Sequence, residues 1–170
     1  GLVLTTVSTS SNVLPTINNS TTVATTSGTA IDFTGIPSGV KKITILFNQV
    51  SCNGTAPRLL QIGTSSGLVT SGYISSGTYC GIGQAGTTST AGFLAGAGGG
   101  TADKTVGTAV IQTIGSNTWC MSSVTGDGTA GYTKMGGGSI TLGAVLDRVR
   151  LSTTSGATFD HGSVNIAWEY

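Results

Sequence analysis

The chain has 170 residues, of which 8% are charged, and its formal net charge is +1. This balance excludes a polybasic nucleic-acid surface and an acidic tail, and no apolar window of about 18 residues exists that would insert into a membrane. The length fits one domain that folds without disulfide bonds, while 28 glycines, abundant Ser and Thr and almost no helix-type sequence predict an all-β domain with many turns.

The first 24 residues carry few apolar positions, which are separated by Thr, Ser and Asn, with Pro15 in the middle. We predict an arm or edge strand over 1–24, followed by a β-sandwich domain over 25–170. The chain starts at Gly1 without methionine and without a signal-peptide pattern. This start indicates a processed product, a trimmed product or a fragment of something longer.

Segment 29–50 predicts two strands joined by a tight turn. Ile31 and Phe33 share one face of the first strand, at the period of two that a half-buried strand shows. Pro37 presets φ for a turn over 36–39, after which alternation resumes. The apolar face of the second strand is formed by Ile43, Ile45 and Phe47. We therefore expect a hairpin whose second strand is central in a packed sheet.

The middle of the chain is rich in turn residues. Asn53-Gly54 is the strongest short hairpin signal, which predicts a return strand over 58–63. A further short strand is expected within 68–74. Over 75–104 the pattern dissolves into Gly, Ser, Thr and Ala, so we expect long loops around one short strand near 91–95. These loops are either a binding region or a plain flexible connection.

Regular alternation resumes towards the C-terminal end. A strand pair is expected at 106–114 and 118–124, then a second glycine-rich loop over 126–138. The remaining predicted strands are 139–142, 146–151 and 163–169. About ten short strands with regular turn signals predict an antiparallel two-sheet sandwich, jelly-roll-like, with long Gly-rich loops.

Several segments match the sequence of a known functional motif but lack the neighbouring elements or residues that the motif needs. Two G-x-G-x-x-G matches, at 81–86 and 126–131, are not followed by a helix pattern, and Asp103 stands where a phosphate loop needs glycine. His161 is the only histidine and lies in a predicted surface turn, without the partners that a metal site needs. We therefore predict no enzyme, no metal and no cofactor. The cysteines, which are expected to be reduced thiols or one disulfide with a free thiol, are Cys52, Cys80 and Cys120.

The aromatic residues divide by context. The predicted core residues are Phe33, Phe47, Trp119 and Trp168. Tyrosines in or beside the Gly-rich loops, with polar neighbours, suit a sugar-binding surface; the alternative is that they cap loop cores. These tyrosines are Tyr73, Tyr79 and Tyr132. The candidate ligand-binding set consists of Tyr79, Asp127, Tyr132 and Lys134. Arg148 and Arg150 share one strand face, so they form either a docking pair for a partner or a solvated face.

Three strings resemble a recurrent domain of bacteriophage tail-fibre and other virion proteins: TSGTAIDFTGIPSGVKKITILFNQVS at 26–51, LLQIGTSSGLVTSGY at 59–73 and LDRVRLSTTSGATFDHGSVNIAWE at 146–169. The resemblance covers framework strands and transfers no binding residues. It implies a virion structural protein that is assembled in the bacterial host cytoplasm and displayed, as a homotrimer among other virion proteins, on a tail fibre or spike that contacts a host-surface glycan.

Two alternatives remain open from the sequence. A capsid decoration or cement protein would bind neighbouring capsid subunits instead of a host molecule. A polysaccharide-degrading enzyme would need two carboxylates that lie close together in the folded chain.

Overall fold

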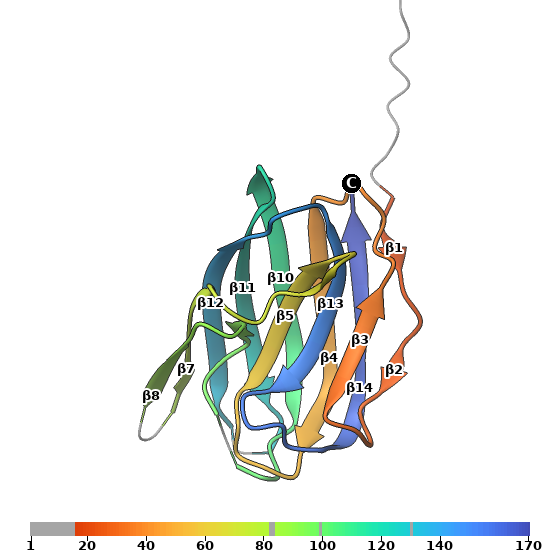
Figure 1. Cartoon of the computed structure of the whole chain (residues 1–170). Helices are drawn as coiled ribbons and strands as arrows, with labels where there is room; N and C mark the ends of the chain where they lie inside the picture. The colour runs from red at the N-terminus through yellow and green to blue at the C-terminus, as the bar shows by residue number, and fades with distance from the viewer. Residues whose placement is uncertain (1–15, 82–83, 99, 130) are drawn as a thin grey trace, which may run out of the picture.

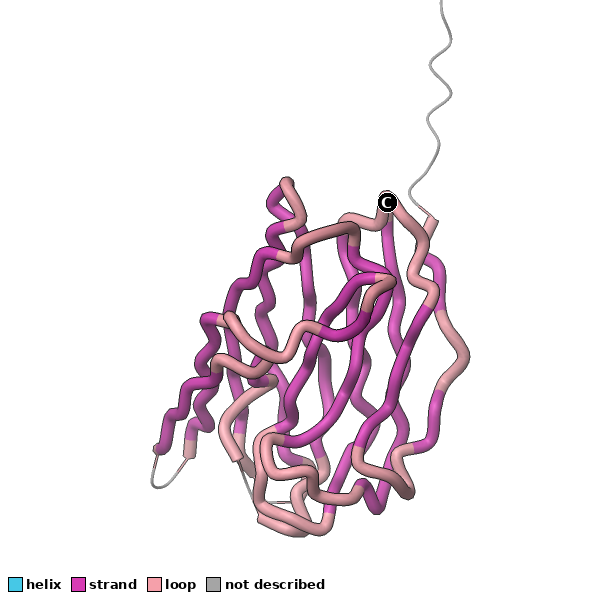
Figure 2. Tube along the Cα trace, viewed as in Figure 1, coloured by secondary structure: helices cyan, strands magenta, loops and turns pink. Residues whose placement is uncertain are grey.

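In the computed structural model, every regular element is a β-strand across the residues described, which are 16–81, 84–98, 100–129 and 131–170 (Figures 1 and 2). In chain order the strands are β1 Asn18–Asn19, β2 Val23–Ala24, β3 Ala30–Thr34, β4 Lys42–Cys52, β5 Arg58–Thr64, β6 Gly67–Leu68, β7 Ile74–Cys80, β8 Ala85–Ser89, β9 Phe93–Leu94, β10 Thr105–Gly115, β11 Thr118–Asp127, β12 Thr133–Thr141, β13 Leu146–Thr153 and β14 Phe159–Glu169.

The strands form two antiparallel sheets that face each other. The larger has nine strands in the order β1-β14-β4-β10-β11-β12-β7-β8, with β2 also on β14. The smaller has five, in the order β3-β13-β5-β6, with β9 on β5. Figure 1 shows the smaller sheet lying across the larger. The predicted antiparallel β-sandwich is confirmed. The described residues form 14 strands where the sequence suggested about ten, and several strands, such as β11 and β14, are longer than predicted.

Alternating apolar side chains from both sheets fill the space between them. From the larger sheet Ile43, Ile45 and Ile166 are buried, and from the smaller sheet Leu60 and Leu151 are buried. The predicted core aromatics Phe33, Phe47 and Trp119 are also buried, whereas Trp168 is half-buried and packs against the core. One face of each long strand is thus closed to water, as its period of two predicted.

The two strands of segment 29–50 form where predicted, but their pairing as a hairpin is wrong. β3 pairs with β13 in the smaller sheet, and β4 pairs with β10 and β14 in the larger. The connection runs from one sheet to the other because Ile36 and Val40, which lie within it, are buried between them. Alternation shows that a strand has a buried face, but it does not say to which sheet the strand belongs.

The hairpin predicted at Asn53-Gly54 is wrong for the same reason, although the strand expected over 58–63 is confirmed as β5. The chain leaves β4 in the larger sheet and enters β5 in the smaller one, so 53–57 bridge the sheets. Asn53 instead binds the chain before β14: its amide N–H donates to the Thr158 carbonyl oxygen, and its side-chain oxygen accepts from the Thr158 amide. The turn chemistry of Asn53 is therefore used to fix a bridge between the sheets.

The glycine-rich segments are more ordered than predicted. Within 75–104 the chain forms β7, β8 and β9, of which only β9 matches the short strand expected near 91–95. The second predicted loop, 126–138, is shorter than expected, because β11 runs on to Asp127 and β12 begins at Thr133 and includes Gly136. A Cβ on Gly136 would lie 1.9 Å from the Leu94 carbonyl oxygen, so glycine here permits close packing of two backbones.

Four further predictions have clear outcomes. Tyr73 is a core residue: its ring meets Phe93 edge to face at 4.9 Å, and the Ile62 amide donates a hydrogen bond to its hydroxyl at 2.8 Å. His161 is exposed, but it lies in β14 between two register shifts and not in a turn. The three cysteines are free thiols. Segment 16–24 supplies β1 and β2 at the edge of the larger sheet, whereas 1–15 lie outside the described residues.

Candidate functional site

The β7–β8 hairpin forms one end of the larger sheet and extends away from the body of the sandwich (Figure 1). Tyr79 lies opposite Ala85 in the pairing of the two strands, and Ser76 lies opposite Thr88. Side chains alternate between the two faces of a strand, so these two pairs project to opposite faces of the hairpin. Each face borders a hollow of its own.

The hollow on the Tyr79 face brings together the two loop tyrosines that the sequence singled out. The rings of Tyr79 and Tyr132 lie 5.3 Å apart between centroids, tilted by 40°. They border a groove of about 530 Å3, here named the tyrosine groove, whose other lining residues include Thr55, Pro57, Ala85, Thr87, Gly98 and Gly100. All the residues that line this groove are uncharged.

Local backbone chemistry fixes Tyr132. Asp127 Oδ1 accepts hydrogen bonds from the Thr129 amide at 2.9 Å and from the Thr129 hydroxyl at 2.7 Å, which closes a side-chain-capped turn. The amide of Asp127 then donates to the Tyr132 carbonyl oxygen at 2.8 Å. A Cβ on Gly81 would lie 2.3 Å from the Tyr132 ring, so the ring rests on bare backbone. One ring face is therefore held in place before any ligand arrives.

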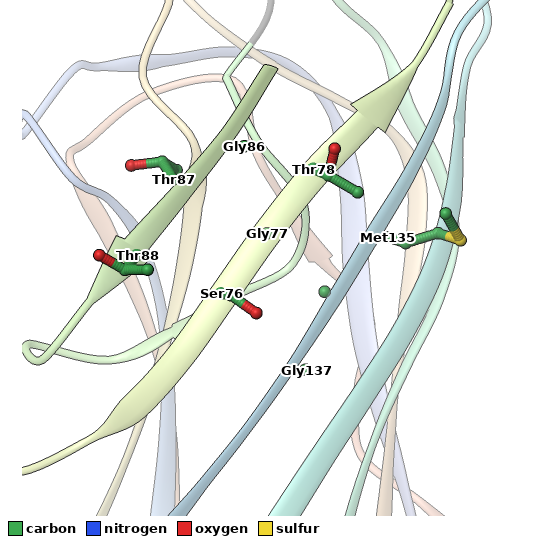
Figure 3. Close-up of a pocket in the computed structure, with 9 residues that line it drawn as sticks. Ser76, Gly77, Thr78, Gly86, Thr87, Thr88, Met135 and Gly137 are labelled. Carbon is green, nitrogen blue, oxygen red and sulfur yellow. The ribbon is translucent and has the colours of Figure 1, made fainter. Parts of the chain in front are cut away.

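The hollow on the opposite face of the hairpin was not anticipated. It has a volume of about 690 Å3 and is lined by several glycines and by Ser76, Thr78, Thr87, Thr88 and Met135 (Figure 3). Thr87 also lines the tyrosine groove. Nothing in the sequence indicated this hollow, because β7, β8 and most of β12 lie in segments that were predicted to be loops. Its Ser and Thr hydroxyls become a surface only when β7, β8 and β12 lie side by side.

Asp127 and Lys134, which were expected on the binding surface, are buried. Lys134 Nζ lies 2.7 Å from Asp103 Oδ2 and 3.4 Å from Asp127 Oδ2, and the exposed fractions of the three side chains are 6%, 5% and 0%. A void of about 10 Å3 is lined by Lys134 and Arg58 and shares Pro57 with the tyrosine groove. The charged cluster thus lies one layer inside the groove, where its side chains do not reach a ligand.

Asp103 and Arg58 complete this buried cluster and were missed as site residues. Burial and a hydrogen bond with Asp127 raise the pKa of Asp103, although Lys134 opposes the rise. The Arg58 guanidinium donates to the carbonyl oxygens of Ala56, Val50 and Asp103 at 3.0 to 3.3 Å. The only signal in the sequence was that both are charged residues in a chain of which 8% is charged.

Arg148 and Arg150 lie on β13 and are paired within the chain. Arg150 forms two hydrogen bonds of 2.7 Å with Asp32, which raise its pKa, and Arg148 Nη2 lies 2.7 Å from Asp147 Oδ1. Their role as a docking pair stays a prediction. Any partner would have to compete with these acids.

Among the residues with described positions, no three His, Cys, Asp or Glu side chains gather as a metal site would require. The same part of the chain holds no helix long and apolar enough to cross a membrane. The chain matches no family model, no curated protein and no solved structure.

Proposed function

We propose that this chain is a non-enzymatic attachment domain of a bacteriophage virion, part of a tail fibre or spike, and that the tyrosine groove binds an uncharged glycan of the host surface. The observation that carries the proposal is the pair of tyrosines, 5.3 Å apart, at a groove of about 530 Å3 without charged lining. The virion setting rests on the three framework strings that resemble phage fibre domains.

The chemistry of the groove suits a sugar. A sugar ring presents a flat C–H face beside hydroxyl groups, and tyrosine offers an apolar ring face with a polar tip. Thr55 and Thr87 supply hydroxyls, and Gly98 and Gly100 leave backbone groups close to the groove. An uncharged lining avoids the penalty of burying an unpaired charge under a neutral ligand.

Binding without hydrolysis is favoured over a polysaccharide-degrading activity. Glycosidases place two carboxyl groups on either side of the scissile bond, about 5 to 9.5 Å apart, in a site open to the sugar. Asp103 and Asp127 do approach each other, but they share a hydrogen bond and the Lys134 ammonium, and they are buried. This pair is arranged to hold one cation and not to flank a substrate.

A virion subunit also needs a surface for its neighbours, and one row of the larger sheet offers it. The register places Leu46, Val124 and Met135 in a single row across β4, β10, β11 and β12 on the outer face. Val124 is 63% exposed, and Leu46 and Met135 are about 40% exposed. This row supports a homotrimer contact and equally the alternative, a decoration protein that binds capsid subunits.

The groove is tested by filling it. Labelled protein is applied to an array of bacterial surface polysaccharides, and Ala85→Trp, which places an indole beside Tyr79, is compared with Thr88→Trp. Both positions are exposed on β8, but Thr88 borders only the opposite hollow. We expect saturable binding that Ala85→Trp abolishes and Thr88→Trp retains. Equal loss in both variants, or no binding by the parent protein, would contradict the glycan proposal.

The apolar row of Leu46, Val124 and Met135 is tested by introducing a charge into it. Native mass spectrometry at micromolar concentration is expected to give a trimer for the parent protein and monomers for Val124→Glu, because an unpaired carboxylate would be buried at the contact. A monomeric parent protein that instead rejoins capsids depleted of decoration protein would favour the second function.

A further inference from the structure

The buried cluster places an amine against a carboxyl group in the protein interior. Lys134 Nζ lies 2.7 Å from Asp103 Oδ2, and Asp127 Oδ2 lies 3.4 Å from the same nitrogen. The three residues come from different segments: Asp103 precedes β10, Asp127 ends β11 and Lys134 lies in β12. Only the folded chain brings them together.

Backbone hydrogen bonds hold these segments in register. The Asp103 amide donates to the Gly100 carbonyl oxygen, and the Gly128 amide donates to the Lys104 carbonyl oxygen at 3.0 Å. The Thr129 hydroxyl also donates to the Ala102 carbonyl oxygen at 3.1 Å. Groups held this close react as if present at a very high concentration, which removes much of the barrier to joining them.

The surroundings disfavour the ionic form of the pair. Ions buried away from water carry a desolvation penalty that their mutual attraction only partly offsets. Arg58 places a second cation near Lys134. Its guanidinium donates a hydrogen bond to the Asp103 carbonyl oxygen, and Arg58 lines the same small void as Lys134. A neutral amide in place of the ammonium and the carboxylate would remove two of these buried charges.

The Asp103 carboxyl group is suited to be the electrophile. Burial and its hydrogen bond with Asp127 raise its pKa, so the neutral acid is more accessible than for an exposed aspartate. A neutral carboxylic acid accepts an attacking amine more readily than a carboxylate does. Asp127 is the second carboxyl group, and it is near enough to both partners to carry a proton between them.

We propose that Lys134 and Asp103 join in an intramolecular amide bond that the folded chain forms by itself, with Asp127 as the proton carrier. The unprotonated Nζ attacks Cγ of the Asp103 carboxyl group, and an N–Cγ bond forms. Asp127 takes a proton from the nitrogen and delivers it to the departing Asp103 oxygen. The Cγ–O bond then breaks, and one water molecule leaves. No oxidant, metal or cofactor is consumed.

The bond would connect two parts of the chain 31 residues apart. Asp103 follows the segment that contributes Gly98 and Gly100 to the tyrosine groove, whereas Lys134 follows Tyr132 on the other side. A covalent link would therefore fix the inner wall of the groove. It would also close a loop in the unfolded chain, which reduces the entropy gained on unfolding.

Intact mass measures the reaction directly. The purified full chain is denatured and weighed, and we expect a mass lower than that of the sequence by one water molecule. After chymotrypsin digestion, peptides 95–119 and 133–142 are expected as one branched species. A parent protein at its full sequence mass would overturn the proposal.

Water loss elsewhere gives a different result. Asp127 precedes Gly128, and cyclisation of that pair would also release water. That product would appear as a linear peptide over 120–132 with reduced mass, and it would count against the Lys134–Asp103 bond.

Three variants separate the roles. Lys134→Arg keeps a cation but not the amine, and is expected at full mass. Asp127→Asn keeps the shape but not the proton carrier, and is expected to convert far more slowly; complete conversion would overturn the role of Asp127. Asp103→Asn would release ammonia and give the same linked product mass as the parent protein. Circular dichroism establishes that each variant is folded before it is weighed.

Discussion

The two halves of the sandwich are held together by different means. Around β4, β13 and β14, large apolar side chains such as Ile45 and Leu151 fill the space between the sheets. Around β7, β9 and β12, glycines let backbones approach each other, and the cluster of Asp103, Asp127 and Lys134 takes the place of part of the apolar core. The first half is stabilised by apolar side chains that fill the space between the sheets. The second half depends on close packing of backbones at glycines, where there is no side chain in between.

The glycine-rich half should therefore fail when a single methyl group is added. Gly136→Ala places a Cβ 1.9 Å from the Leu94 carbonyl oxygen, so β9 or β12 has to move. We expect a loss of about 3 kcal/mol in the free energy of unfolding, the upper part of the usual range for overpacking. Gly137→Ala is the matched control, because its Cβ would meet nothing nearer than 3.7 Å. Urea unfolding measures both, and similar values for the two variants would contradict the contrast between the halves.

Tyr73 joins the halves, because it packs on Phe93 and binds Ile62 through its hydroxyl. Burial raises its pKa from 10.0 to about 12, although the hydrogen bond with the Ile62 backbone opposes the rise. As the pH rises from 10 to about 12, the phenol of Tyr73 loses its proton in the unfolded state but keeps it in the folded state. The free energy of unfolding should therefore fall by about 2 to 3 kcal/mol over this range.

Urea unfolding at a series of pH values from 9 to about 12 measures this loss. In Tyr73→Phe this part of the pH dependence should vanish. A parent protein and variant with the same alkaline slope would show that Tyr73 does not titrate as a buried group.

The apolar half should tolerate the reverse change, the loss of one methylene group. Ile45 is buried in the core, and Ile45→Val is expected to reduce the free energy of unfolding by about 1 kcal/mol. Ile74→Val, at an exposed position on β7, should change it by less than about 0.5 kcal/mol. Thermal unfolding of both variants checks whether burial alone accounts for the difference.

A small effect is also expected on the surface of the apolar half, where Arg150 on β13 pairs with Asp32 on β3. Both side chains are more than a third exposed, so solvent screens their attraction. A double-mutant cycle of Arg150→Ala and Asp32→Ala should give a coupling energy below about 1 kcal/mol. A value of several kcal/mol would mean that this pair belongs to the stabilising framework.

The sequence predicted the fold class and most long strands because alternation at period two follows directly from burial of one face. It did not predict that β3 and β4 lie in different sheets, since the same alternation fits either pairing. The ordered β7–β8 hairpin and the first half of β12 were missed because glycines such as Gly77 in β7 and Gly136 in β12 have no side chain that could show a pattern of burial. Tyr79 and Tyr132 could be singled out because they lie in or beside the Gly-rich loops. The burial of Lys134 could not be predicted, because it depends on a partner distant in the sequence, Asp103.

The bridges between the sheets bear on how fast the chain acquires its structure. Asp32 and Arg150, which face each other across β3 and β13, are 118 residues apart in the chain. β3 and β4 follow one another in the chain but lie in different sheets, so they do not pair with each other. The β10–β11–β12 meander is the part with short-range pairing, so it is the natural starting point, and closure of the smaller sheet must await most of the chain. Refolding on a timescale of roughly milliseconds to seconds is therefore expected.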